Sequence, residues 1–140
     1  MSFTNCYEDT ARAESYAKLE FPGTYYLAFR DLPTIISNHA KGNVAMDFGC
    51  GAGRSTRFTK NLGFEIIGVD ISTEMITAAK RIDPIGDYRI VKEGILDHFE
   101  DNSFDLIQSI FTFDNVPTEK LKIQLFSEFR RILKKDGIMI

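Results

Sequence analysis

The stretch that decides the fold is Val44-Ala45-Met46-Asp47-Phe48-Gly49-Cys50-Gly51-Ala52-Gly53-Arg54. It begins with a short apolar run over residues 44–48, which is typical of a buried strand. Three alternating glycines follow, and residues 55–62 predict a helix that ends before Gly63. Glycine permits a sharp backbone turn and lets a ligand approach the main chain closely. This order of strand, glycine-rich turn and helix predicts a ligand-binding turn at the end of a strand.

The alternation of strands and helices continues to the end of the chain. Further strands are expected at residues 64–69, 88–91 and 104–110, with helices at 72–81 and 117–136. A fifth strand is expected to begin at Ile138, inside which the chain stops. This pattern predicts an α/β fold with a mainly parallel sheet and helices on both of its faces.

The residues before Val44 are rich in aromatic side chains and have helical character. Tyr7, Ala11, Ser15 and Leu19 are spaced four residues apart, which places them on one face of a first helix. A second helical stretch is expected over residues 25–32. We therefore expect residues 1–42 to form a helical cap on the core of the same domain, residues 43–140.

Composition limits the classes of protein to which the chain can belong. Its 140 residues, 44% of them hydrophobic and 26% charged, allow one globular domain. The sequence has no apolar run long enough to span a membrane. A net charge of −3 disfavours a nucleic-acid partner, because such partners usually bind a basic surface. The two cysteines, Cys6 and Cys50, are too few for a disulfide framework and favour a reducing, cytoplasmic location.

Asp47 indicates which ligand the glycine turn binds. The glycines have the spacing G-x-G-x-G, whereas a dinucleotide site normally has G-x-G-x-x-G. A carboxylate is an unfavourable neighbour for a pyrophosphate but a favourable one for an ammonium or a sulfonium. A nicotinamide-dependent oxidoreductase is therefore an alternative that both the spacing and Asp47 disfavour.

A second carboxylate, Asp70, follows the strand expected at residues 64–69. A carboxylate at this place accepts hydrogen bonds from both hydroxyls of a ribose. The alternative is a carboxylate that only stabilises the N-terminus of the following helix. The glycine turn that precedes it in the chain favours the ribose.

Four segments, VAMDFGCGAGRST, IIGVDIS, EGILDHFEDNSFDLIQSIF and FRRILKKDGIMI, resemble in that order the class I S-adenosylmethionine-dependent methyltransferases, in particular those that methylate small molecules. The resemblance covers about residues 40–140. It implies a Rossmann-like sheet with strand order 3-2-1-4-5, S-adenosyl-L-methionine as the methyl donor and S-adenosyl-L-homocysteine as the product. The family usually has two further strands, which often shape the pocket for the methyl acceptor.

The resemblance also implies a set of cofactor-binding residues. Asp47 would face the ammonium of the methionine moiety, Asp70 would hold the ribose, and Ile71 would pack against the adenine. Where the family usually has Gly-Asp-Ala, this chain has Glu93-Gly94-Ile95-Leu96, so either Glu93 or Ile95 would meet the adenine amino group. The implied set is Asp47, Gly49, Cys50, Gly51, Gly53, Asp70, Ile71, Glu93, Gly94, Ile95 and Ser109.

The sequence marks no clear catalytic base. Methyl transfer needs in-line geometry above all, and a base only where the acceptor must lose a proton. Asp114, just before Pro117, is the candidate; a loop cap is the alternative. Cys50 is expected to be a packing residue, because no basic partner is visible near it. Arg54 either pairs with the cofactor carboxylate or is a solvated residue of the first helical turn.

Three alternatives concern function and assembly. A non-catalytic module that binds S-adenosylmethionine would have the same cofactor motifs as an enzyme. Aromatic residues of the cap, among them Tyr16 and Tyr25, either close over the cofactor or belong to the core. An apolar fifth strand without a neighbour would favour self-association through its edge.

Overall fold

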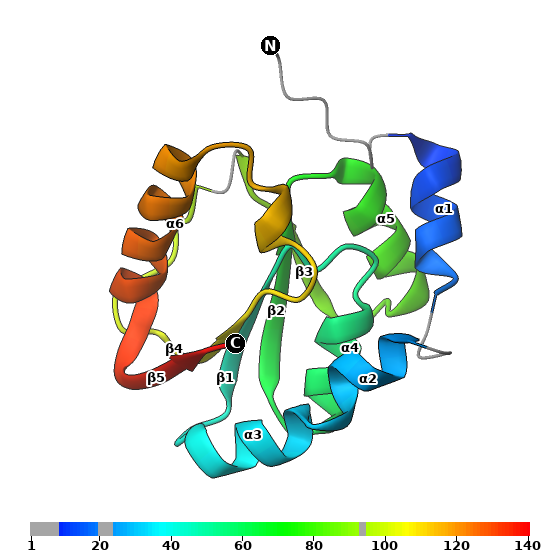
Figure 1. Cartoon of the computed structure of the whole chain (residues 1–140). Coiled ribbons are helices and arrows are strands. Elements are labelled where there is room, and N and C mark those ends of the chain that lie inside the picture. The colour runs from blue at the N-terminus through cyan, green and yellow to red at the C-terminus, as the bar shows by residue number, and fades with distance from the viewer. Residues whose placement is uncertain (1–8, 20–23, 93–94) are drawn as a thin grey trace.

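The structure, a computed structural model, describes residues 9–19, 24–92 and 95–140. One parallel sheet of order β3-β2-β1-β4-β5 forms its centre (Figure 1). The order 3-2-1-4-5 predicted from the sequence is therefore confirmed. The strands are β1 (Val44–Phe48), β2 (Glu65–Asp70), β3 (Asp87–Ile90), β4 (Phe104–Gln108) and β5 (Leu133–Met139).

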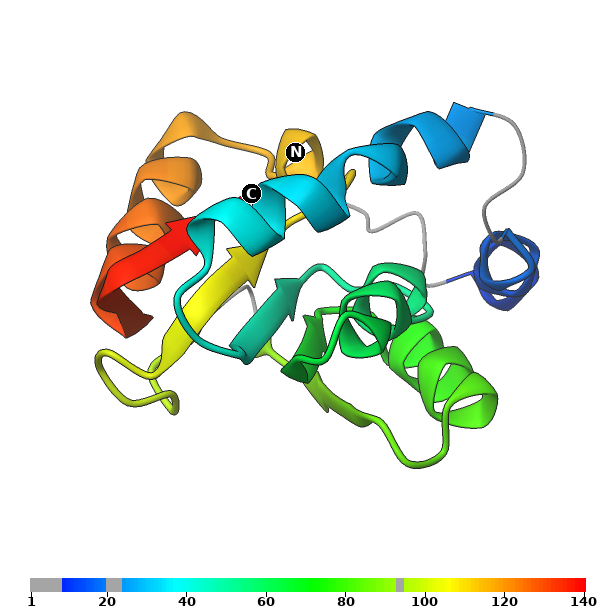
Figure 2. The same ribbon diagram turned by 90° about the horizontal axis from the view of Figure 1, so that it is seen from below.

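Helices cover both faces of the sheet (Figure 2). One face packs against α6, and the other packs against the helices from α2 to α5. Within the described residues, no helix has the length and apolar character needed to cross a membrane. The helices are α1 (Thr10–Ala17), α2 (Thr24–Arg30), α3 (Leu32–His39), α4 (Arg54–Asn61), α5 (Thr73–Ile82), α6 (Glu119–Ile132) and a short 3-10 turn, Phe113–Asn115.

The alternation of side chains along β1 separates the two halves of the core. Phe48 packs edge-on against Phe129 of α6, with ring centroids 5.0 Å apart. Ala45 lies on the other face, in a cluster with Ile36 of α3. Asp47 shares that second face, because side chains two positions apart in a strand point the same way. The alternation therefore directs a carboxylate towards α4.

Helix α1 lies beside α5 (Figure 1) and buries a different face from the predicted one. Ala13 and Ala17 are buried against α5, whereas Ala11 and Ser15 are exposed. The predicted stripe was therefore wrong at these two positions, and Tyr7 lies outside the described residues. The small side chains of Ala13 and Ala17 allow α1 to lie close to α5, and this contact explains why their face of α1 is the buried one.

The boundary between α6 and β5 also differs from the prediction. The sequence predicts a helix up to Gly137, but α6 ends at Ile132 and β5 begins at the next residue. Leu133 is paired with Phe104 of β4, and the register then shifts before the next pair. The ammonium of Lys134 lies 2.9 Å from a carboxylate oxygen of Asp105, so this segment is held against β4 rather than continuing the helix.

Candidate functional site

The turn after β1 is built from three glycines in the left-handed conformation. The φ angles of Gly49, Gly51 and Gly53 are +73°, +54° and +81°, a region that other residues rarely adopt. The amides of Gly49 and Cys50 donate to the carbonyl of Val69, at 2.8 and 3.0 Å. These bonds attach the turn to the end of β2. The turn therefore sits where the carboxyl ends of β1 and β2 meet, the usual ligand-binding edge of such sheets.

Two of the glycines are needed because neighbouring side chains pack against them. A Cβ atom on Gly49 would overlap the side chain of Thr112. A Cβ atom on Gly53 would lie 2.6 Å from the hydroxyl of Tyr88. Both contacts are shorter than packed atoms allow. These glycines let β3 and the segment after β4 close tightly around the turn.

Gly51 has more space around it than the other two glycines. The nearest atoms to a Cβ atom there would be Cε1 of Tyr16 at 3.4 Å and Sδ of Met75 at 3.9 Å, both ordinary contacts. Position 51 therefore favours glycine because of its backbone conformation and not because a side chain would clash. Of the three glycines, it is the one at which the surrounding atoms leave space for a Cβ atom.

Asp70 at the end of β2 is hydrogen-bonded to the glycine turn. Its Oδ2 accepts from the amide of Gly51 at 2.8 Å, and its Oδ1 accepts from the amide of Ser72 at 2.9 Å. Burial raises the pKa of Asp70, and the backbone donors act in the opposite direction. A carboxylate oxygen can accept more than one hydrogen bond. Asp70 therefore keeps acceptor capacity at the glycine turn, where a pair of hydroxyls can be bound.

Asp47 is fully buried in a polar cluster between β1, β4 and α4. Its Oδ2 accepts from the hydroxyls of Ser55 and Thr56, at 2.6 and 2.7 Å. The neighbouring Gln108, paired with Asp47 in the sheet register, accepts from Thr59 at 2.6 Å. Among the described residues, Oδ1 of Asp47 and the amide nitrogen of Gln108 have no partner within hydrogen-bond geometry, although Gln108 still acts to lower the pKa of Asp47.

Burial raises the pKa of Asp47 from 3.8 to about 6, against the effect of its hydroxyl donors. Asp47→Asn is therefore expected to raise the free energy of unfolding at pH 7 and to leave it nearly unchanged at pH 4. Below pH 3.8 the carboxyl is neutral in both states. As the pH rises from 3.8 towards 6, Asp47 ionises in the unfolded chain but stays protonated in the folded one. The free energy of unfolding of the wild-type chain therefore falls by on the order of 3 kcal/mol. Urea unfolding of both proteins at the two pH values measures this difference, and an equal difference at both would contradict the shift.

The segment after β4 closes the site from the other side. The amide of Ser109 donates to the carbonyl of Ile140 at 2.8 Å, so this amide belongs to the sheet. Phe111 has φ +61°, a strained value for a bulky residue, and its side chain is 48% exposed. The hydroxyl of Thr112 donates to the carbonyl of Gly49 at 2.9 Å. The strained turn is thus attached to the glycine turn.

The side chain of Cys50 is buried under the turn, where its thiol lies 3.5 Å from the carbonyl oxygen of Gly51. It packs with Ile76 and Tyr88 and forms no disulfide. Burial, followed by the nearby carboxyls of Asp47 and Asp70, raises the pKa of its thiol well above the usual value. A thiol held in its neutral form is a poor nucleophile. The environment fits the packing role expected from the sequence.

Three of the remaining sequence-derived candidates lie in segments that the structure describes. Ile71 and Ile95 are 43% and 44% exposed, and they follow β2 and β3 in the chain. Glu93 and Gly94 lie outside the described residues. Asp114 has an exposed side chain in the 3-10 turn that precedes α6. Ile71 thus offers apolar surface next to Asp70 in the chain, and Ile95 offers apolar surface in the segment after β3.

The hydroxyl residues that hold the turn in place are not among the site residues predicted from the sequence. Ser55 and Thr56 bind Asp47, and Thr112 binds Gly49. A pattern that points to the first two is visible in the chain, because α4 buries polar residues where an ordinary amphipathic helix buries apolar ones. Thr112 has no such pattern, since its contact depends on how β4 and β1 are paired.

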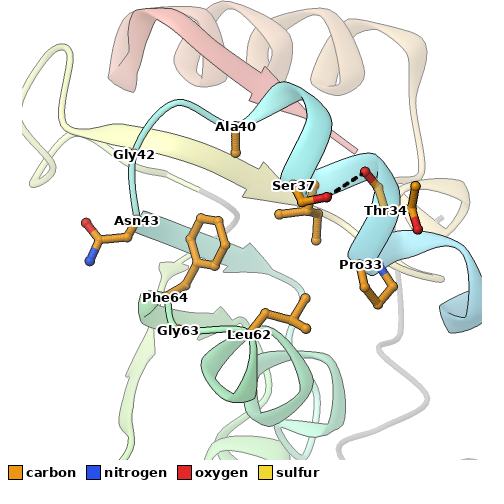
Figure 3. A pocket seen from close by; sticks show the side chains of 10 residues that line it. Pro33, Thr34, Ser37, Ala40, Gly42, Asn43, Leu62, Gly63 and Phe64 are labelled. Atoms are coloured by element: carbon orange, nitrogen blue, oxygen red, sulfur yellow. Dashed lines mark hydrogen bonds between the residues drawn. The ribbon is translucent and has the colours of Figure 1, made fainter.

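An open groove of about 590 Å³ lies at the other end of the strands, where β1 and β2 begin (Figure 3). It is bounded by residues that precede β1 and β2 and by α3, and so it opens where these strands begin. Ligands of open α/β sheets bind outside the carboxyl ends of the strands. The groove is therefore separate from the glycine turn. Its lining includes Pro33, Ser37, Asn43, Leu62 and Phe64.

Comparison with known proteins gives a family and several relatives. The family model described as "Methyltransferase domain" matches residues 46–140. The 2-methyl-6-phytyl-1,4-hydroquinone methyltransferase of Synechocystis sp. is 29% identical over 71% of this chain and 31% of that protein. The N-demethylindolmycin N-methyltransferase of Streptomyces griseus is 29% identical over 94% of this chain and 56% of that protein. The chain thus spans about a third to just over half of these relatives.

Solved structures share the fold over most of the chain. A TehB-like SAM-dependent methyltransferase from Corynebacterium glutamicum matches with a TM-score of 0.70 at 22% identity, over 94% of this chain and 72% of that one. This likeness extends the agreement in fold beyond the strand order to 94% of the chain, as the class I motifs predict. The family match over residues 46–140 shows that the chain belongs to the methyltransferase-domain family.

Proposed function

We propose that the chain binds S-adenosyl-L-methionine and takes part in transfer of its methyl group to a small molecule. The observation that carries the proposal is the hydrogen bond between Asp70 and the amide of Gly51, which brings the carboxylate and the glycine turn into one site. Such a site presents an acceptor for ribose hydroxyls beside a backbone that a ligand can approach closely. The residues present therefore fit the cofactor.

The ribose, the adenine ring and the ammonium of the methionine moiety each have a matching group in this proposal. Asp70 accepts from the ribose hydroxyls, and the exposed surfaces of Ile71 and Ile95 contact the adenine. Gly49 and Gly51 border the methionine moiety. Asp47 acts from beneath the turn, where its buried carboxyl adds negative potential under the ammonium. Its raised pKa is typical of groups that functional sites retain at a cost in stability.

The bound cofactor would supply a methyl group already activated by its sulfonium. The protein's part is then to hold the acceptor in line and to exclude water, which can supply about 7–11 kcal/mol at most. Asp114, exposed in the 3-10 turn that follows β4 in the chain, is our candidate for orienting or deprotonating the acceptor. Phe111, three residues earlier, has an exposed ring that packs edge-on against Tyr25 of α2, with ring centroids 5.7 Å apart.

The acceptor is tested by incubating the chain, and the chain extended through further strands, with radiolabelled S-adenosyl-L-methionine. The panel contains hydroquinones, indole derivatives and small amines, with tRNA as the nucleic-acid alternative. Label in a small molecule supports the proposal. Cofactor binding without transfer to any acceptor by either form would favour the non-catalytic binding module. Label in tRNA alone would contradict a small-molecule acceptor and the inference from the net charge.

The isolated 140-residue chain is expected to self-associate through β5. This strand is last in the sheet order, so one of its edges has no neighbouring strand among the described residues. Ile140 bonds to β4 through both its amide and its carbonyl, so by alternation the polar groups of Met139 face the open edge. Light scattering over a concentration series measures association, which Met139→Pro is expected to reduce. A monodisperse wild-type monomer would contradict the expectation.

We also propose a reducing, cytoplasmic setting. The proposal is supported by the scarcity of cysteine in the sequence and by the buried thiol of Cys50.

A further inference from the structure

Arg54, the first residue of α4, connects the glycine turn to the N-terminal helices. Its side chain is nearly buried, with 7% of the residue exposed. The guanidinium lies 4.2 Å from the ring centroid of Tyr25 in α2 and 5.4 Å from that of Tyr16 in α1. It also donates to the hydroxyl of Tyr16 and to the carbonyl of Leu19, each at 3.3 Å. One side chain thus contacts both helices and the segment that follows α1.

Helix α1 depends on this contact more than α2 does. Its eight residues are too few for an isolated helix to be stable in water. Its buried residues, Ala13 and Ala17, are small and provide little apolar area. Helix α2 is better anchored, because Phe29 is buried in the cluster formed with α3 and the sheet. The contacts with Arg54 therefore add to the packing of Ala17 on α5 and to the ion pair between Glu14 and Arg81 in holding α1.

The position of α1 matters because Tyr16 lies against the glycine turn. Its Cε1 atom is the nearest atom to the Cβ position of Gly51, at 3.4 Å. Tyr16 therefore forms a wall of the space beside Gly51, which is the space that the proposed function gives to the methionine moiety. Any change that releases α1 removes this wall.

We propose that Arg54 is a positioning residue that docks α1 over the glycine turn, so that occupancy of the cofactor site and the docking of α1 are thermodynamically linked. The linkage rests on the proposed function, whereas the docking role does not. A ligand that contacts Tyr16 binds the docked state more tightly than the undocked state. By reciprocity, ligand binding strengthens the docking of α1 by the same factor by which docking strengthens ligand binding, and a variant that populates the undocked state binds the ligand more weakly.

Hydrogen exchange of the amides of α1 in the ligand-free chain tests the docking role. Arg54→Gln removes the cation and is expected to speed exchange across α1 about tenfold, while exchange in β1 and β2 is unchanged. Arg54→Lys keeps the charge but lacks the planar guanidinium, so its α1 amides should exchange at a rate between those of wild type and Arg54→Gln. The matched control is Arg30→Gln, because Arg30 is an exposed arginine of α2 that pairs with Asp31. This control should behave as wild type.

Ligand binding tests the linkage. S-adenosyl-L-homocysteine is expected to slow the exchange of α1 in the wild-type chain, and Tyr16→Leu, which retains Arg54, is expected to weaken its binding. The alternative is that Arg54 acts only by touching the ligand. In that case Tyr16→Leu would bind S-adenosyl-L-homocysteine with wild-type affinity, and the amides of α1 in ligand-free Arg54→Gln would exchange at the wild-type rate. Either result overturns the proposal. Wild-type protein that binds no S-adenosyl-L-homocysteine would contradict the proposed function and the linkage. In that case faster exchange in ligand-free Arg54→Gln would still support docking by Arg54.

Discussion

Gly51→Val is expected to lower the affinity for S-adenosyl-L-homocysteine by about 100-fold or more while the chain stays folded. The first added carbon would make only ordinary contacts with Tyr16 and Met75, so the surrounding packing tolerates it. The branched side chain nevertheless occupies the space beside the turn that the ligand needs. A β-branched residue at φ +54° also costs about 1–3 kcal/mol of strain, which acts against the hydrogen bond from this amide to Asp70.

Gly63→Val is the matched control for this prediction. Gly63 also has a positive φ, +96°, and it has open space where a Cβ atom would stand. It lies after α4, at the end of the sheet opposite to the glycine turn. The control should therefore carry similar backbone strain without a loss of affinity. Calorimetric titration of both variants, with thermal unfolding as the check on folding, separates the two effects. Wild-type affinity in a folded Gly51→Val would remove Gly51 from the binding site.

Asp70→Ala is expected to weaken binding by about 1.5–3 kcal/mol, or roughly 10- to 150-fold, because the ribose hydroxyls lose a charged acceptor. The variant also leaves the amides of Gly51 and Ser72 without their acceptor, so the turn becomes less well ordered. Asp70→Asn keeps one acceptor oxygen and should fall between wild type and Asp70→Ala. Affinity is therefore expected to fall in the order wild type, Asp70→Asn, Asp70→Ala.

The control for the carboxylate is Asp87→Ala in the neighbouring strand β3. Asp87 pairs with Arg89 on the surface, and removal of this exposed pair is expected to leave binding unchanged. Affinity is measured by the same titration, after circular dichroism has shown that each variant is folded. Unchanged affinity in folded Asp70→Ala would mean that this carboxylate serves only the glycine turn and the start of α5.

The sequence predicts the features of this fold that depend on local pattern. Alternation of apolar runs with turns gives the five strands, and right-handed crossovers with the family resemblance give their order. The spacing of the glycines and Asp70 gives the site, because consecutive parallel strands end at one edge of the sheet. The hydrogen bond between Asp70 and Gly51 is a direct consequence of that geometry.

Features that depend on tertiary contact were not predictable in the same way. The helix expected up to Gly137 ends at Ile132 because Leu133 pairs with Phe104, a partner distant in the sequence. The buried face of α1 follows from which side chains let it approach α5. Likewise, Thr112 reaches Gly49 only because β1 and β4 are neighbours. Sequence periodicity carries no information about such partners.

The central claim, that the glycine turn and Asp70 form a site for S-adenosylmethionine, is tested most directly by calorimetric titration of the chain. The three ligands are S-adenosyl-L-methionine, S-adenosyl-L-homocysteine and NAD. We predict that the first two bind with one-to-one stoichiometry and compete with each other, whereas NAD neither binds nor competes. Binding of NAD in preference to both, or no binding by either S-adenosyl compound, would contradict the claim.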